Sequence, residues 1–305
     1  MATARRGALR RADAGAAARR RDAALEDGLS RVPAGWIEID WAHPAFARLA
    51  AVGAPVAQAV GQAVGQGADL RDVLNAHAER QDLRTAGGHP LRFIPQGALP
   101  SGAAYEAHIA ATGGVPTRDN LHDFFNALIW LYWPRTKAAL NARQASAIAR
   151  DGIGAVRGAV RDAATLFDEN ALIFLCTDDA PERCLTGFDW PGLFIEGRAA
   201  WGRSCAVLPF GHALLEKLVA PYKSITAHAW PVHVASLEAA AQTASIDAVL
   251  ADTLASADLT TSDFRPLPVM GIPGWCEANR DPAFYSDAAV FRPGRRTSAK
   301  PGQKC

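Results

Sequence analysis

The chain has 305 residues, which is long enough for one large domain whose core closes without a disulfide or a metal ion. Its net charge of +1 hides basic ends, because residues 35–291 hold only 19 of the 32 basic residues against 27 acidic ones. An acidic body argues against nucleic-acid binding by the folded part, since such binding neutralises phosphates with clustered Lys and Arg.

The five cysteines form no CxxC pair and are odd in number, which indicates neither a disulfide framework nor a cysteine zinc site. We therefore expect a reducing cytoplasm. No apolar run approaches the roughly 20 residues that a membrane-crossing helix needs, so we expect a soluble protein without a transmembrane segment. The expected organisation is a disordered basic extension at 1–34, a single globular domain at 35–293 and a disordered basic tail at 294–305.

The first half of the domain is predicted to begin with helices. Alanine-rich segments predict short helices at 44–51 and 55–64, and apolar spacing predicts a third near 70–77. The segments LRFIPQ (91–96) and YEAHIAATG (105–113) have strand-like composition and are bounded by prolines and glycines. A pair of strands is therefore expected before residue 119.

The stretch NLHDFFNALIWLYWPRTKAALN predicts two helices, 119–133 and 134–150, because Pro134 fits the first turn of the second one. A helix over 151–170 and a buried strand ALIFLCT follow. Later segments predict, in order, helices at PERCLTGF and WPGLFIEGRAAW, an extended CAVLPF, a helix at HALLEKLVA, a strand at KSITAHAWPVHVA and a helix over 236–255 capped by Ser236. The sequence thus predicts an α+β fold: a mostly helical single domain with a small sheet and an irregular Pro/Gly-rich C-terminal segment.

The helix that begins near residue 120 carries polar residues inside an apolar run. His122 and Asn126 lie one turn apart on one face, and Arg118 and Asp119 come just before them, so these side chains can line one polar edge. Asp123 stands three residues after Asn120, as in a capping box, which favours a structural role for it. For His122, a buried structural role and a role in a site are both open.

In the next helix, Lys137 and Asn141 are expected one turn apart on one face, and Arg143 on a neighbouring edge. If the two helices fold against each other at Pro134, Lys137 and Asn141 face the same cleft as His122. Solvation at the surface is the simpler interpretation of the lysine.

The run FGHALLEKL places His212 and Glu216 on one face of a helix that starts just after a glycine. This spacing suits a histidine and carboxylate that bind one metal ion, or a carboxylate that orients a catalytic imidazole. A surface contact that stabilises the helix by a few tenths of a kcal/mol is the structural alternative.

The segment RDAATLFDEN contributes Asp162, Asp168 and Glu169 ahead of a buried strand, where they could ligate a hard cation, although no DxDxDG loop is present. His228 and His233 lie on opposite faces of the following strand, so at most one of them, with Lys223, can join a site near His212.

Two functions are compatible with these residues. The first is a hydrolase-like enzyme in which His122, Asn126, His212 and Glu216 are catalytic, Arg118, Lys137 and Asn141 bind the ligand, and a divalent metal ion is a candidate cofactor, joined by one acid from Asp162, Asp168 or Glu169. The second is a non-catalytic binding or assembly protein in which these residues are structural and the ligand is a small molecule or another protein. No GxGxxG, Walker, GxSxG or HExxH motif narrows the choice.

Four segments, taken together, resemble a known family: PTRDNLHDFFNALIWLYWPRTKAALNARQ, RDAATLFDEN, PFGHALLEKLVAPYKSITAH and PGWCEANRDPAFYSDAAVFRP. In this order they are similar to the bacterial family named domain of unknown function 3025. The resemblance covers roughly residues 36–293 and implies a single-domain proteobacterial protein. It implies no activity, so the candidate site residues above rest on residue type and spacing.

Overall fold

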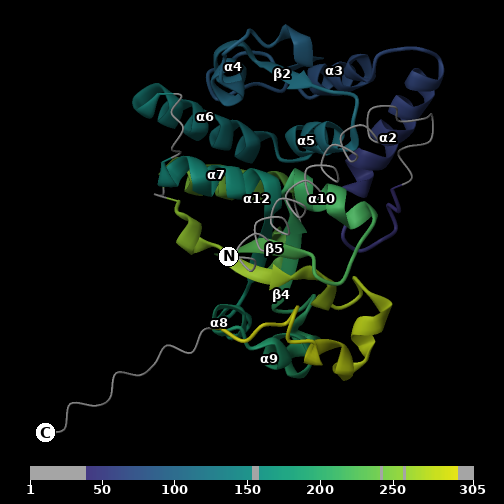
Figure 1. The fold of residues 1–305 in the computed structure, drawn as a ribbon, viewed down its shortest axis with the longest axis vertical. Coiled ribbons are helices and arrows are strands. Elements are labelled where there is room, and N and C mark those ends of the chain that lie inside the picture. The colour runs from purple at the N-terminus through teal and green to yellow at the C-terminus, as the bar shows by residue number, and fades with distance from the viewer. Residues whose placement is uncertain (1–38, 153–157, 241–242, 257–258, 295–305) are drawn as a thin grey trace, which may run out of the picture.

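A four-stranded sheet with the order β4-β3-β5-β6 lies at the centre of the molecule (Figure 1). The structure is a computed structural model that describes residues 39–152, 158–240, 243–256 and 259–294. The extension expected at 1–34 therefore lies outside the described residues, as does the tail expected at 294–305 apart from Gly294. Among the described residues, no helix is both long enough and apolar enough to pass through a membrane.

All six residues of β3 are buried, which explains the unbroken apolar run that predicts this strand. β3 pairs antiparallel with β4 on one side and parallel with β5 on the other, and β5 pairs antiparallel with β6. The bounds of the four strands are β3 Ala171–Cys176, β4 Cys205–Pro209, β5 Thr226–His233 and β6 Arg265–Pro268.

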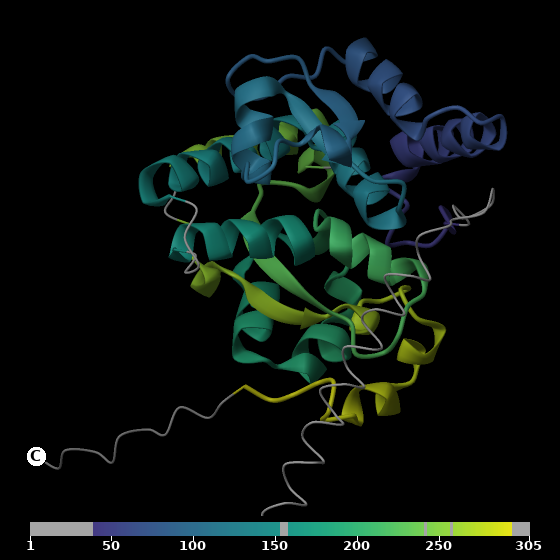
Figure 2. The ribbon, with the colours of Figure 1, turned by 45° about the horizontal axis from the view of Figure 1, so that its top comes forward.

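Helices cover the sheet in layers. α7 packs directly on β3 and β5, and α10 packs beside α7, while α8 lies on the other side of the sheet with α9 (Figures 1 and 2). α5 and α6 then pack over α10 and α7, and the N-terminal elements lie outermost. The helices run as α2 Ala50–Gly65, α3 Leu70–Arg80, α4 Tyr105–Thr112, α5 Leu121–Tyr132, α6 Pro134–Asp151, α7 Ala159–Asn170, α8 Asp179–Gly187, α9 Trp190–Phe194, α10 His212–Val219, α11 Leu237–Ala240 and α12 Thr243–Ser256.

The fold class predicted from the sequence is confirmed as a mostly helical α+β domain, but three local predictions are wrong. Residues 41–49 form turns, and one helix, α2, runs through Pro55, so the separate helices at 44–51 and 55–64 are not observed. Val56, Ala57 and Val60 of α2 are buried, and this packing outweighs the hydrogen bond that a proline cannot donate.

The second wrong prediction is the strand at 105–113, which is the helix α4. The strand that pairs with β1 (Arg92–Pro95) is instead β2 (Gly114–Thr117), and the pairing is parallel. Two parallel strands need a crossover connection, and α4 supplies it here. The third concerns α7, which begins at Ala159 rather than at 151; Gly152 ends α6 with a φ of +76°.

The C-terminal segment is irregular, as predicted, but it also supplies the edge strand β6 that sequence patterning misses. The rest of this segment folds into short 3-10 helices at Val269–Gly271, Glu277–Arg280 and Pro282–Ser286. Asn279 is fully buried and its amide donates to the carbonyl oxygens of Met270 and Ile272, which fixes the turns between these helices.

The close approach of Gly211 to the end of α7 positions the N-terminus of α10. A Cβ atom at Gly211 would lie 2.5 Å from both the carbonyl oxygen of Glu169 and the amide nitrogen of Asn170. The amide of Gly211 also donates to the carbonyl of Ala171 at 2.9 Å. Only a residue without a side chain can therefore hold α10 this close to α7.

We predict that Gly211→Ala lowers the free energy of unfolding by about 1–3 kcal/mol or more, because the new methyl group would contact backbone atoms that cannot yield cheaply. Urea denaturation followed by circular dichroism measures the change. Gly61→Ala in α2 is the matched control: a Cβ there meets nothing within 4 Å, so this variant should be as stable as the wild type or slightly more so. Equal effects of the two substitutions would contradict the packing argument.

Candidate functional site

His122 lies in the first turn of α5, where local chemistry fixes the helix start. The side chain of Asn120 accepts a hydrogen bond from the amide of Asp123 at 2.8 Å, so Asn120 caps the helix as predicted. The carboxylate of Asp123 does not reach back to Asn120. It accepts from the backbone amide and the guanidinium of Arg118 instead. Asp123 is thus structural, and Arg118 is largely occupied by it.

The two histidines singled out from the sequence meet in space. Nε2 of His122 lies 3.0 Å from Nε2 of His212, and Nδ1 of His122 lies 2.9 Å from Oε2 of Glu216. The spacing of His212 and Glu216 on α10 therefore does bring both onto one target, and that target is His122. Because a carboxylate only accepts, Glu216 places the proton of a neutral His122 on Nδ1 and leaves a lone pair on Nε2.

The rings of His122 and His212 are not arranged for a straight hydrogen bond. Their centroids are 4.4 Å apart and their planes meet at 78°. A linear N–H···N bond of 3.0 Å would separate the centroids by roughly 5 Å or more, since each centroid lies behind its nitrogen. The hydrogen bond between the two nitrogens is therefore bent.

Two acids at the end of α7 lie beside His212, one near each of its ring nitrogens. Oε2 of Glu169 is 3.6 Å from Nε2 of His212, and Oδ1 of Asp168 is 3.9 Å from Nδ1 of His212. One ligand atom from each of His122, His212 and Glu169 lies within 4.8 Å of the other two, which is compact enough for a shared metal ion. Asp168 also forms a buried ion pair with Lys137 from α6.

The opposite wall comes from α4, and sequence reasoning misses its residues. Asn126 donates to the hydroxyl of Tyr105 at 3.0 Å, and Asn141 donates to the carboxylate of Glu106 at 2.6 Å. Tyr105 and Glu106 escape notice because their segment is misread as a strand. A helical interpretation would have placed both in the first turn of a helix, with Glu106 suited to that position.

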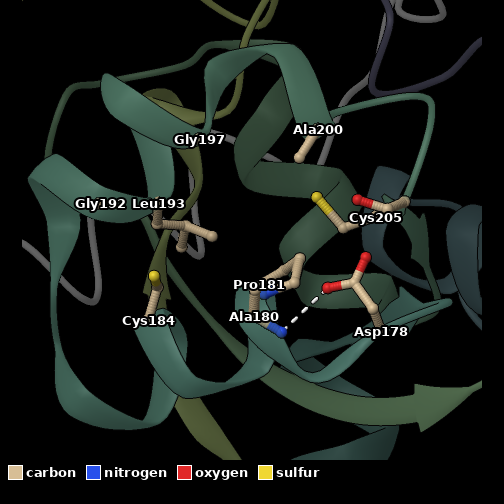
Figure 3. Close-up of a pocket in the computed structure, with 10 residues that line it drawn as sticks. Asp178, Ala180, Pro181, Cys184, Gly192, Leu193, Gly197, Ala200 and Cys205 are labelled. Atoms are coloured by element: carbon tan, nitrogen blue, oxygen red, sulfur yellow. Dashed lines mark hydrogen bonds between the residues drawn. The ribbon is translucent and has the colours of Figure 1, made fainter.

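These groups line a cleft of about 370 Å³ between α4, α5, α7 and α10. The residues around it are mainly polar: Gln96, Tyr105, Glu106, Arg118, His122, Asp123, Asn126, Asp168, Glu169 and His212. Figure 3 shows another cavity, of about 180 Å³, between α8, α9 and the start of β4. Its walls are mostly apolar, and its one carboxylate, Asp178, caps α8 through the amide of Ala180, so it offers no comparable chemistry.

Burial and neighbouring charges shift the acid–base properties of the cleft. Burial lowers the pKa of His212 to about 3, which keeps this imidazole neutral at physiological pH. Burial acts in the same direction on His122, but the hydrogen bond to Glu216 and the charge of Glu169 outweigh it and raise the pKa. Burial would raise the pKa of Asp168, but the charge of Lys137 holds it below its ordinary value.

The pKa values of two carboxyl groups in the cleft are raised. Burial, followed by the charge of Asp168, raises the pKa of Glu106 to about 7, although Lys137 and the amide of Asn141 oppose the shift. Burial and Asp168 also raise the pKa of Glu169. The cleft therefore holds more carboxylates than its own cations can neutralise.

Several residues considered from the sequence lie elsewhere. Asp162 is exposed near the start of α7, and Asp119 pairs with Arg71 on the surface. His233 pairs with Glu182 beyond the sheet, and Lys223 pairs with Asp287. The remaining two, His228 on β5 and Arg143 on α6, are not among the residues that line the cleft.

The fold and the cleft define the class of protein: a mostly helical α+β domain with two histidines and several carboxylates gathered between α5, α7 and α10. The family model described as "Protein of unknown function (DUF3025)" matches residues 91–295, two thirds of the chain. The chain therefore belongs to the DUF3025 family, and the match includes all residues of the cleft. Comparisons with curated proteins and with solved structures returned no match.

We predict that Glu106→Gln changes how stability depends on pH. The pKa of Glu106 is raised from 4.5 to about 7, so the folded protein holds this proton more tightly than the unfolded chain. The contribution of the group is complete below the unfolded pKa and is lost as the pH rises toward 7. Glutamine cannot ionise, so the free energy of unfolding of the variant, relative to wild type, should rise by roughly 1–3 kcal/mol between about pH 5 and about pH 7.5.

Urea denaturation at several pH values measures this difference. Glu277→Gln is the control, because Glu277 is exposed and pairs only with Arg280 at the surface. Its difference from wild type should stay flat. A flat profile for Glu106→Gln as well would mean that Glu106 ionises freely in the cleft.

Proposed function

We propose that the protein is a metal-dependent hydrolase that binds one divalent transition-metal ion through His122, His212 and Glu169. Two imidazoles and a carboxylate are a donor set that suits such ions. The observation that carries the proposal is the approach of the two Nε2 atoms to 3.0 Å beside Glu169, while Glu216 accepts from Nδ1 of His122. Nδ1 of His212 is buried without a hydrogen-bond partner among the described residues, and the carboxylate of Asp168 lies 3.9 Å from it. With the proton of His212 on this Nδ1 atom, two lone pairs face each other, and a cation between them would remove their repulsion.

A proton between the two nitrogens is the alternative, since neutral His212 protonated on Nε2, or an imidazolium of His122, can donate to the other ring. The angle between the rings favours the metal. Nitrogens 3.0 Å apart on steeply inclined rings are close enough for one ion with metal–nitrogen bonds of about 2.1 Å to be held by both. Burial, followed by the charge of Asp168, raises the pKa of Glu169, and a cation beside this carboxylate would relieve that cost.

The chemistry would be activation of water. A divalent ion held by His122, His212 and Glu169 would supply the activation of water for hydrolysis. In such a reaction the oxygen of water would bond to the electrophilic centre as the bond to the leaving group breaks, and a proton of that water would pass to the leaving group. Glu216 would orient His122 through Nδ1, as carboxylates commonly do for metal-binding histidines.

The alternative function is a non-catalytic binding or assembly protein. The pairs formed by Asp123 with Arg118 and by Lys137 with Asp168 favour it to the extent that these residues are structural. Neither pair accounts for the convergence of His122, His212 and Glu169 beside a cleft. We therefore place the enzyme first.

We also propose that the protein is bacterial and works in a reducing cytoplasm. Cys176 and Cys205 are directly opposed partners on β3 and β4, yet both are free thiols, as are Cys184 and Cys276. Burial raises the pKa of Cys176 and of Cys205, which makes them poor thiolate nucleophiles and suits a structural role.

His122→Ala and His212→Ala are each expected to abolish stoichiometric metal binding. Equilibrium dialysis against Zn²⁺, Co²⁺ and Mn²⁺, followed by elemental analysis, measures it. His233→Ala is the matched control, since His233 is exposed and pairs with Glu182 away from the cleft. Wild-type protein that binds no metal, with a melting temperature unchanged by EDTA, would remove the metal-dependent form of the proposal.

Glu216→Gln should weaken metal binding by about 10- to 100-fold without unfolding the protein, because the amide no longer fixes the proton of His122 on Nδ1. The same dialysis, with circular dichroism as a check on folding, measures the effect. If His122→Ala instead loses several kcal/mol of stability and no ligand, the structural alternative gains support.

A further inference from the structure

One wall of the cleft, lined by Glu106 and Asn126, offers hydrogen-bond acceptors that the described residues do not fully satisfy. The hydroxyl of Tyr105 donates its single proton to the carbonyl of Pro116, so Asn126 must present its NH₂ group to that hydroxyl. The orientation of the Asn126 amide is thereby fixed. Its Oδ1 is buried in the wall of the cleft without a hydrogen-bond donor, and the residue is only 7% exposed.

Glu106 stands on the same wall and is also without a cation. Among the described residues it forms no ion pair within 4.0 Å, and its carboxylate is met only by the amide of Asn141. The ammonium of Lys137 forms an ion pair with Asp168, so Lys137 acts on Glu106 only by longer-range electrostatic attraction. Lys137 and Asn141, which the sequence suggests as ligand-binding residues, thus act on carboxylates of the cleft.

The balance of charge points the same way. Five carboxylates lie in or beside the cleft: Glu106, Asp123, Asp168, Glu169 and Glu216. Arg118 and Lys137 neutralise two of them, and a divalent ion beside Glu169 would offset two more. One negative charge then remains when Glu106 is ionised, and Glu106 is the carboxylate without an ion-pair partner among the described residues. Anionic groups of a substrate would be repelled from this wall, whereas a monovalent cation that donates hydrogen bonds would fit it.

We propose that the substrate carries a free ammonium group, which the carboxylate of Glu106 and Oδ1 of Asn126 hold beside the metal ion. This inference rests on the proposed function, because it takes the scissile bond to lie at the metal. Asn126 is one helical turn from His122 on the same face of α5, so the ammonium would sit about 5–6 Å from the metal-binding side chain. The substrate class is therefore an amine-bearing amide or ester.

Calorimetric titration of the zinc-loaded full chain with three simple amides tests the proposal: glycinamide, β-alaninamide and 4-aminobutyramide, each against its N-acetyl derivative. Acetylation removes the charge and leaves the amide unchanged. At least one free amine should bind about tenfold or more tightly than its acetylated partner, because a charge-assisted hydrogen bond is lost. The chain length that binds best reports the distance between the ammonium site and the metal.

Glu106→Gln should abolish the preference for the free amine while the bound zinc per chain stays unchanged. Glu106→Asp, which keeps the charge but shortens the side chain, should retain part of the preference and serves if the glutamine variant does not fold. Glu277→Gln, an exposed glutamate remote from the cleft, should behave as wild type.

Equal affinity for the free and acetylated amides, or no binding of either, overturns the ammonium site. Loss of zinc in Glu106→Gln also overturns it, since Glu106 would then be a metal ligand. Failure of the proposed function has a different signature: the wild type would bind no zinc, and the same titrations on metal-free protein would still show whether Glu106 selects an amine.

Discussion

The site depends on the contact between Gly211 and the junction of α7 with β3. Because Gly211 has no side chain, α10 can begin against the backbone of Glu169 and Asn170. His212, the next residue, then reaches the acids at the end of α7, and Glu216 one turn later faces His122 of α5. A bulkier residue would push α10 away and separate all three groups. Gly211 is therefore needed both for the packing of α10 on α7 and for the arrangement of the side chains in the site.

The cleft is organised by pairing of charges in a poorly solvated space. Arg118 forms a hydrogen-bonded ion pair with Asp123, and Lys137 forms one with Asp168. These pairs leave Glu169 and Glu106 under-neutralised on opposite walls, and burial raises the pKa of both carboxyl groups. Groups held in this state bind cations more readily than solvated carboxylates do, since binding relieves an existing cost. This imbalance supports both proposals about ligands, which rest on the geometry of the cleft.

Much of the fold could be predicted because its signals are local. The buried strand β3, the Pro134 start of α6 and the cap at Asn120 each follow from a few neighbouring residues. The errors arise where tertiary packing overrides the local signal. Pro55 is accommodated inside α2, and α4 forms from a segment with strand-like composition because β1 and β2 need a crossover between them. The misread α4 is also why Tyr105 and Glu106 were not among the predicted site residues.

The sequence by itself determined which residue types were available and how they were spaced on each helix. It placed His212 and Glu216 on one face, and His122 and Asn126 on another, because helical periodicity fixes these relations within a single element. Only the tertiary structure decided that the two faces meet, that Asp168 and Glu169 join them while Asp162 does not, and that α4 closes the opposite wall. Residues from separate helices converge only through long-range packing, and spacing along one chain carries no information about the distance between faces.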